Sequence, residues 1–277
     1  MPIALAAMCA LLWGTADFCG GTASRRSPST VVLLWSSALA LPVVVVLWAV
    51  VDRAPFTTST VLWGAVAGGA GALGILSLYR GLATGVMGVV APISSTSVIV
   101  PVVYGYATGA DLPVLCGLGI VVAIVGVVLA GGPHIRDFRG SAAPLLFALA
   151  ASLGIGVSLV AVAEGSRDAA FPTLVSMRIA YLIVLVPIVL LSRGARTVDR
   201  SSVPLVAAAG LGDVLAVTLY GIATRGGSLP VVAALASMYP VTTLVLARQL
   251  HHERLEREQW IGVLTALVGI VLVVTTQ

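Results

Sequence analysis

Residues 119–129 have the sequence Gly-Ile-Val-Val-Ala-Ile-Val-Gly-Val-Val-Leu, and residues 262–272 have the sequence Gly-Val-Leu-Thr-Ala-Leu-Val-Gly-Ile-Val-Leu. Each stretch carries two glycines seven positions apart and then three aliphatic residues. Further matches occur in the same order: Trp13-Gly14 with Leu153-Gly154, Leu82-Ala83-Thr84 with Ile222-Ala223-Thr224, and Pro101 with Pro240. All offsets lie between 139 and 143 residues, close to half of the 277-residue chain. The pattern predicts two sequence repeats.

The composition shows that lipid is the solvent for most of the chain. Hydrophobic residues make up 59% and charged residues 9%, whereas soluble domains contain about 25% charged residues. The mean hydropathy is +1.09. The net charge of +4 comes from 15 arginines that are scattered between apolar runs. That distribution is typical of membrane loops and gives no basic face for nucleic acid.

Apolar runs long enough to cross a bilayer recur along the chain. Because Met1-Pro2-Ile3 offers no positive charge, the first run is expected to be a retained span and not a signal peptide. The runs are apolar on all sides, as in Val43-Val44-Val45-Val46-Leu47, which excludes membrane strands. The predicted helical spans are 3–22, 30–51, 60–80, 87–107, 112–131, 141–163, 172–192, 203–223, 230–250 and 258–275.

The expected fold is therefore an all-α integral membrane protein of ten transmembrane helices in two five-helix repeats, residues 1–137 and 138–277. Five is an odd number, so the second repeat must be inverted relative to the first. Inverted repeats are common in secondary transporters, whose substrate site lies near the membrane midplane between the repeats.

The sequence resembles the EamA family of the drug/metabolite transporter superfamily, in its ten-helix form, over essentially the whole chain. Residues 10–18, Ala-Leu-Leu-Trp-Gly-Thr-Ala-Asp-Phe, are similar to the family's opening Leu-Trp-Gly helix. His252-Glu253-Arg254-Leu255 resembles the acidic turn before its last helix. Gly109-Ala110-Asp111-Leu112-Pro113 departs from the usual turn in the first half, and Asp17 replaces a neutral polar residue. The resemblance implies export of amino acids, nucleosides or other metabolites.

Two acids inside predicted spans are the first candidates for function, because ionisable groups in a membrane are costly. Asp17 lies about 21 Å into the first span and Asp213 about 15 Å into the eighth, from a rise of 1.5 Å per residue. Asp17 suits a proton-coupling or cation-coupling acid or the counter-ion of a substrate amine; the alternative is a hydrated acid near the interface. Asp213 is expected to line a cavity or to pair with a cation.

Other candidates lie in or near the same spans. Arg178, about 9 Å into its span, is interpreted first as a structural anchor that snorkels to the interface; the alternatives are a substrate carboxylate site or a pair with Asp213. Trp13 lies halfway along its span and is a candidate cavity wall. Ser94 and Ser95 lie near Pro92 and Pro101, and Tyr239-Pro240 marks the corresponding place in the second repeat. Bent helices with polar side chains can line a pathway, although these hydroxyls can also bond the preceding turn.

Several motifs are interpreted as structural. Gly69-Ala-Gly71-Ala-Leu-Gly74 matches the dinucleotide fingerprint formally, but it lies inside an apolar span without the required strand and acid. With Gly64 and Gly68 it is expected to form a surface for close helix packing. The three cysteines show no paired or metal-ligand spacing, and no cofactor, metal or catalytic constellation is expected.

The predicted function is a secondary transporter, not an enzyme, that exports small metabolites such as amino acids by alternating access. An integral membrane enzyme for lipid-linked substrates and a multidrug exporter are the alternatives. The expected partners are a small-molecule substrate, the bilayer and protons as coupling ion, and no nucleic acid. The protein is expected to be a monomer or homodimer in the plasma (inner) membrane of a bacterium. Loops after odd-numbered spans hold eleven arginines and loops after even-numbered spans three. This favours both termini outside, whereas relatives are usually described with both termini inside.

Overall fold

The structure is a computed structural model of the chain, and it describes residues 1–84, 90, 93–110, 113–130, 143–192, 194, 196–251 and 257–275. Within these residues the chain is helical and forms no strand. Four sequence features lie outside the described residues: Pro92, the repeat boundary at 137/138, and the turns at 131–139 and 252–255. The boundary therefore stays a prediction.

The first repeat runs from α1 to α6. Its elements are α1 (Pro2–Ser24), α2 (Ser29–Val51), α3 (Thr58–Thr84), the short 3-10 helix η1 (Thr96–Val98), α5 (Ile99–Ala107) and α6 (Val114–Ala130). The second repeat contains α7 (Ala143–Asp168), α8 (Ala170–Leu191), the 3-10 helix η3 (Arg200–Ser202), α9 (Val203–Gly226), α10 (Leu229–Ala236), α11 (Tyr239–His251) and α12 (Arg257–Thr275).

The predicted all-α membrane fold of ten spans is confirmed, with end shifts of a few residues. In the described part of the chain, seven helical segments are long and apolar enough to cross a membrane, and shorter apolar helices accompany them. One detail differs from the expectation. The span predicted over 230–250 is broken between α10 and α11 at Ser237 and Met238. The break lies next to Tyr239-Pro240, where the sequence indicated a bend. The fourth span contains the tightened turn η1 near the corresponding place.

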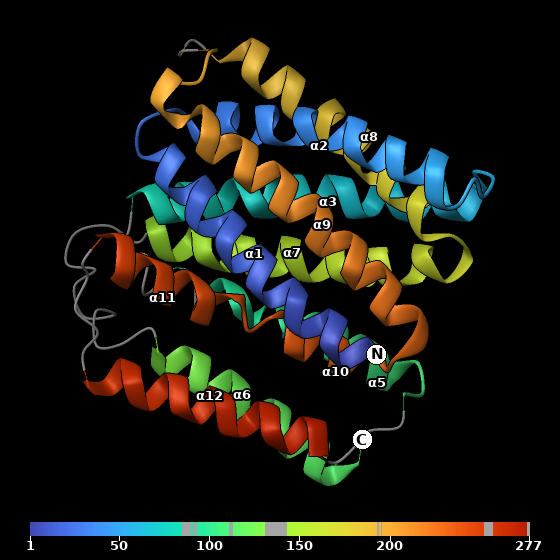
Figure 1. The fold of residues 1–277 in the computed structure, drawn as a ribbon, viewed down its shortest axis with the longest axis vertical. Coiled ribbons are helices and arrows are strands. Elements are labelled where there is room, and N and C mark those ends of the chain that lie inside the picture. Colours follow the sequence, from blue (N-terminus) through green and yellow to red (C-terminus); the bar gives the residue numbers. More distant parts are fainter. Residues whose placement is uncertain are drawn as a thin grey trace.

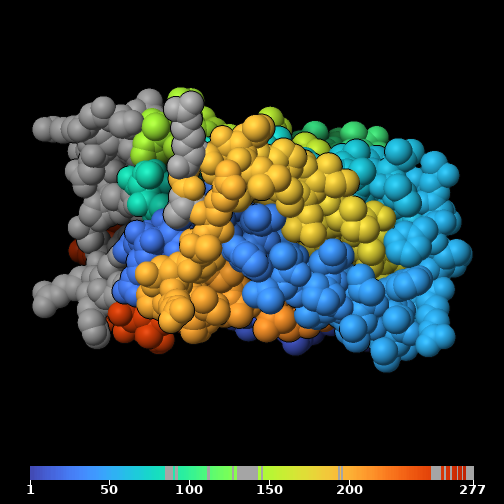
Figure 2. All heavy atoms as spheres, turned by 90° about the horizontal axis from the view of Figure 1, so that it is seen from above, coloured from blue at the N-terminus to red at the C-terminus, as the bar shows by residue number. Residues whose placement is uncertain are grey.

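The helix contacts follow a two-fold pattern that exchanges the repeats. α3 packs on α7 and α8, and its counterpart α9 packs on α1 and α2. α1 contacts α10 and α11, as α7 contacts η1 and α5. α2 pairs with its own counterpart α8, and α6 with α12. Figure 1 shows the α6–α12 pair along one edge of the bundle, and Figure 2 shows α2 and α8 on the opposite face.

The α6–α12 contact explains the glycine pattern that defines the repeat. A Cβ atom on Gly126 would lie 2.1 Å from the amide nitrogen of Ala266, and one on Gly269 would lie 2.3 Å from that of Ala123. The two contacts are related by the 143-residue offset of the repeat. Because glycine has no side chain, the two helix backbones can come into direct contact, which is how small residues support helix packing in membranes.

Either Gly126→Val or Gly269→Val should destabilise the protein by a similar amount, because both substitutions force the same pair of backbones apart. Overpacking of this kind costs about 1–3 kcal/mol. The melting temperature of the purified protein in detergent measures the effect. Gly117→Val is the matched control on α6, since a Cβ atom there would have nothing within 4 Å. Equal melting temperatures for all three variants would contradict this packing.

The glycines of α3 also pack closely, as expected. A Cβ atom on Gly68 would lie 2.4 Å from the carbonyl oxygen of Met177, and one on Gly74 would lie 2.7 Å from the amide nitrogen of Ile155. Gly69 differs, because nothing lies within 4 Å of its Cβ position. The run that resembles a dinucleotide fingerprint is therefore a helix-packing surface against α8 and α7.

At one end of the bundle, the α1–α2 turn is held to the α8–α9 connection. The Asp199 amide donates to Ser27 Oγ at 3.0 Å, and an Arg26 guanidinium nitrogen donates to Ser201 Oγ at 3.3 Å. Asp199 accepts hydrogen bonds from the hydroxyl and the amide of Ser201, which hold the pKa of its carboxyl below the usual range. The N-terminus and the last described turn of α12 lie at the other end of the bundle (Figure 1), as an even number of spans requires.

We expect the end that carries Arg25, Arg26 and Arg200 to face the cytoplasm, because arginines concentrate in cytoplasmic loops. A tag on the C-terminus of the protein in intact cells should then be accessible to a membrane-impermeant reagent. Labelling only after permeabilisation would contradict this orientation and would agree with the arrangement usually given for relatives.

Candidate functional site

A small cavity lies where helices of the two repeats meet. α1 and α3 of the first repeat line it together with α7, α8, α9 and the α10–α11 break of the second. Its volume is about 50 Å³, which is room for a few water molecules. The lining residues are Trp13, Asp17, Gly71, Ile75, Ile155, Ser158, Leu159, Val162, Met177, Tyr181, Asp213, Val217, Ser237 and Tyr239.

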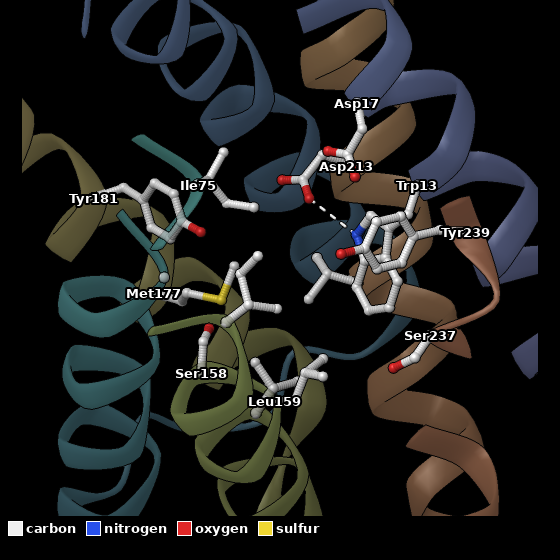
Figure 3. A pocket seen from close by; sticks show the side chains of 14 residues that line it. Trp13, Asp17, Ile75, Ser158, Leu159, Met177, Tyr181, Asp213, Ser237 and Tyr239 are labelled. Carbon is white, nitrogen blue, oxygen red and sulfur yellow. Dashed lines mark hydrogen bonds between the residues drawn. The ribbon is translucent and has the colours of Figure 1, made fainter. Parts of the chain in front are cut away.

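Each long helix presents one stripe to the cavity. Trp13 and Asp17 on α1 are four positions apart, as are Asp213 and Val217 on α9, and side chains at this spacing lie on the same face of a helix. The stripes bring Trp13 and Asp17 next to Asp213, which lies about 200 residues further along the chain (Figure 3).

Asp213 is held by two donors. The indole nitrogen Nε1 of Trp13 donates to Oδ1 at 3.0 Å, and Nη2 of Arg178 donates to Oδ2 at 2.5 Å. The Trp13 ring in turn lies 5.7 Å from the buried ring of Tyr220, measured between centroids. From the sequence, Asp213 was expected to line a cavity or to pair with a cation, and in the structure it does both.

Arg178 lies inside the bundle, so its expected role as a snorkelling interfacial anchor is wrong. The residue is 1% exposed, its guanidinium carbon lies 5.4 Å above the Tyr181 ring, and its charge is paired with Asp213. Depth along a helix does not tell which way a side chain points, and Arg178 points toward α9. It lies behind Asp213 and is not among the residues that line the cavity.

Asp17 differs from Asp213 because it has no compensating partner. It is 8% exposed and lines the same cavity. In the part of the chain that the structure describes, its carboxyl makes no hydrogen bond or ion pair. Figure 3 shows its side chain next to Asp213, on the side away from Tyr181. The alternative of a hydrated acid near the interface does not fit this burial.

Tyr239, Ser94 and Ser95 lie where the fourth and ninth spans come together. Tyr239 begins α11 and lines the cavity, and its hydroxyl lies 3.4 Å from Ser94 Oγ. Ser94 also donates to the carbonyl of Val90, four positions earlier in the chain, at 3.0 Å. Ser95 is buried but does not line the cavity. The ninth span therefore reaches the cavity through Tyr239 and through Ser237 in its break, whereas no described residue of the fourth span lines the cavity.

Several cavity residues were not predicted from the sequence, among them Ser158, Met177 and Tyr181. Ser158 donates to the carbonyl of Ala67 at 2.8 Å and so links α7 to α3. Tyr181 follows Arg178 by three positions on α8, and this spacing could have indicated it once Arg178 was known to point inward. The neutral residues of α7 carry no comparable feature in the sequence.

Comparisons with known proteins agree with this architecture. The family profile described as the EamA-like transporter family matches residues 1–132 and again residues 142–275. A solved structure titled "Crystal structure of protein" superposes with a TM-score of 0.81 at 15% sequence identity, covering 99% of this chain and 96% of the other. That likeness concerns the fold alone. A search of curated proteins gives no match.

The two family matches together cover almost the whole chain, one for each repeat. The protein is therefore a multi-pass membrane protein with the two-repeat fold of membrane transporters. It belongs to the EamA-like transporter family, a transporter family of the drug/metabolite type.

Proposed function

We propose that this protein is a secondary transporter that exports small metabolites, such as amino acids or related compounds, across the bacterial inner membrane by alternating access. The observation that carries the proposal is the position of the cavity. Residues of both repeats line it, and it contains the uncompensated acid Asp17. Substrate sites between inverted repeats, beside interrupted helices, are the usual arrangement in such transporters.

The size of the cavity supports movement of the repeats. Ligand sites for small molecules enclose about 300–1,000 Å³, whereas this cavity has a volume of about 50 Å³. A substrate can enter only if the helices that line the cavity move apart. The proposed transport cycle therefore includes a widening of the cavity toward each side in turn.

A membrane enzyme that acts on lipid-linked substrates is the second candidate function. Such an enzyme needs an acidic or metal-binding group within reach of the lipid headgroups. The acids brought together here, Asp17 and Asp213, instead line a narrow interior cavity. This placement favours transport of a small molecule.

The proposal is tested with purified protein in liposomes, by uptake and efflux of a panel of labelled amino acids, amines, nucleosides and organic acids. We expect movement of at least one class of small metabolite above protein-free liposomes. Activity confined to lipid substrates, or no movement of any compound in the panel, would overturn the proposed function.

A further inference from the structure

We propose that the substrate is a small organic cation, an amine without a compensating carboxylate, and that it exchanges one for one with a proton at the Asp17 carboxyl. This inference rests on the proposed function and narrows the substrate of the same site from small metabolites in general to net cations, which excludes zwitterionic amino acids. It follows from the charges around the cavity, from its aromatic walls and from the isolation of Asp17.

The charges around the cavity leave one negative group without a partner. Arg178 is 1% exposed and bound to Asp213, so this pair is neutral as a unit. Asp17 lies beside it without an ion pair in the described part of the chain. An isolated ionised carboxylate in the membrane interior is costly. Either a proton or a bound cation removes that cost, and each excludes the other.

The lining residues disfavour an anion. The ionisable side chains among them are the carboxyls of Asp17 and Asp213 and the phenols of Tyr181 and Tyr239, whereas the nearby cation Arg178 is paired with Asp213 and does not line the cavity. A substrate carboxylate would therefore be repelled by Asp17, and it would find Arg178 already paired with Asp213. In a zwitterion, this repulsion of the carboxylate would offset the attraction between Asp17 and the ammonium group. A net cation is attracted by the Asp17 carboxylate, and the Asp213–Arg178 pair, neutral as a unit, opposes it little.

Aromatic rings form part of the wall around these acids. Trp13, Tyr181 and Tyr239 line the cavity, and Figure 3 shows Tyr181 and Tyr239 on opposite sides of it. Aromatic faces attract ammonium groups, most strongly where water is excluded. One carboxylate together with aromatic rings is a suitable arrangement for an alkylammonium group.

The exchange conserves charge and atoms. With the cavity empty, Asp17 holds a proton on its carboxyl. The entering ammonium displaces this proton, so that an ammonium–carboxylate pair forms and one proton leaves to water. The total charge of the loaded cavity equals that of the empty one, and movement of a monovalent substrate against a proton is electroneutral. Asp213 keeps its Arg178 partner and takes no part in the exchange.

The inference is tested by proton release from the purified protein in weakly buffered detergent, followed with a pH indicator. The probes are every compound that the liposome screen finds to be transported, together with three molecules of similar shape. These are choline as cation, glycine betaine as zwitterion and 3,3-dimethylbutan-1-ol as neutral analogue. Binding is measured in parallel by isothermal titration, on the wild type, Asp17→Asn and the exposed-site control Asp168→Asn.

We expect the transported compounds to be cations, each releasing up to one proton per protein on binding. Their apparent affinity should rise about tenfold per pH unit while Asp17 is protonated, since one proton is displaced. Asp17→Asn should abolish the release and weaken cation binding at least tenfold, and Asp168→Asn should behave as wild type. A cooperative melting transition of Asp17→Asn in detergent, at a temperature close to that of wild type, shows that the variant is folded.

Transport of neutral, zwitterionic or anionic compounds only would overturn the inference while leaving the proposed function intact. Cation binding without proton release, or release that persists in a folded Asp17→Asn variant, would also overturn it. If no compound is transported at all, the proposed transport function itself is refuted. This result differs from transport of non-cations only, which refutes the substrate class and the proton exchange alone.

Discussion

Replacing Asp213 with Asn should lower the stability of the protein more than replacing Arg178 with Gln, and the double variant should recover most of the loss. Asp213→Asn leaves the guanidinium of Arg178, 1% exposed, without a counter-charge. Removing one partner of a buried ion pair costs about 3–5 kcal/mol. Arg178→Gln should cost less, because the Asp213 side chain is 26% exposed and keeps its bond from Trp13.

The measurement is a double-mutant cycle on melting temperatures in detergent, which isolates the coupling between the two side chains. Asp168→Asn, at an exposed position on α7, is the control for loss of a carboxylate and should change little. If the losses of the two single variants simply add in the double variant, the buried pair has no coupling and the described geometry is incorrect.

Replacing Asp17 with Asn should abolish accumulation driven by a pH difference. An exchange of one monovalent cation for one proton allows a pH difference of one unit to support about a tenfold concentration ratio. Asn has the size of Asp but cannot carry the proton, so the ratio should fall to about one. The variant should keep its fold, because an uncharged side chain removes the cost of an isolated carboxylate in the membrane.

The measurement is uptake of a transported cation into liposomes with a more acidic interior, compared between wild type and Asp17→Asn. Asp168→Asn again serves as control and should accumulate the cation as wild type does. A folded Asp17→Asn variant that still reaches the wild-type ratio would remove Asp17 from the coupling mechanism.

The fold could be predicted well from the sequence, because the membrane imposes strong constraints on a chain. Apolar runs of about 20 residues have few structures available in lipid other than helices, and the repeat of Gly126 and Gly269 specified two related halves. The break at Ser237 and Met238 was less visible. Proline and hydroxyl residues indicated a bend near it, but the exact residues at which a helix ends depend on tertiary packing.

The site could be predicted only in part. Asp17, Asp213 and Trp13 stood out because charges and mid-span tryptophans are rare in apolar helices, and the structure brings them together. Arg178 was misinterpreted because its distance from the start of its helix suggested access to the interface. The pairing of α8 with α9 turns it inward, and such contacts between distant helices are absent from the local sequence. Ser158 and Tyr181 were missed for the same reason.

The central claim, that the cavity between the repeats opens to each side of the membrane in turn, is tested most directly by a cysteine at Ser158. Ser158 lines the cavity on α7 (Figure 3), and the native Cys9, Cys19 and Cys116, all buried, are replaced by Ala. Liposomes containing Ser158→Cys are treated with a membrane-impermeant maleimide from outside or from inside. The account predicts labelling from either side, with rates that change in opposite directions when a transported substrate is added. Labelling from one side only, with and without substrate, would contradict it.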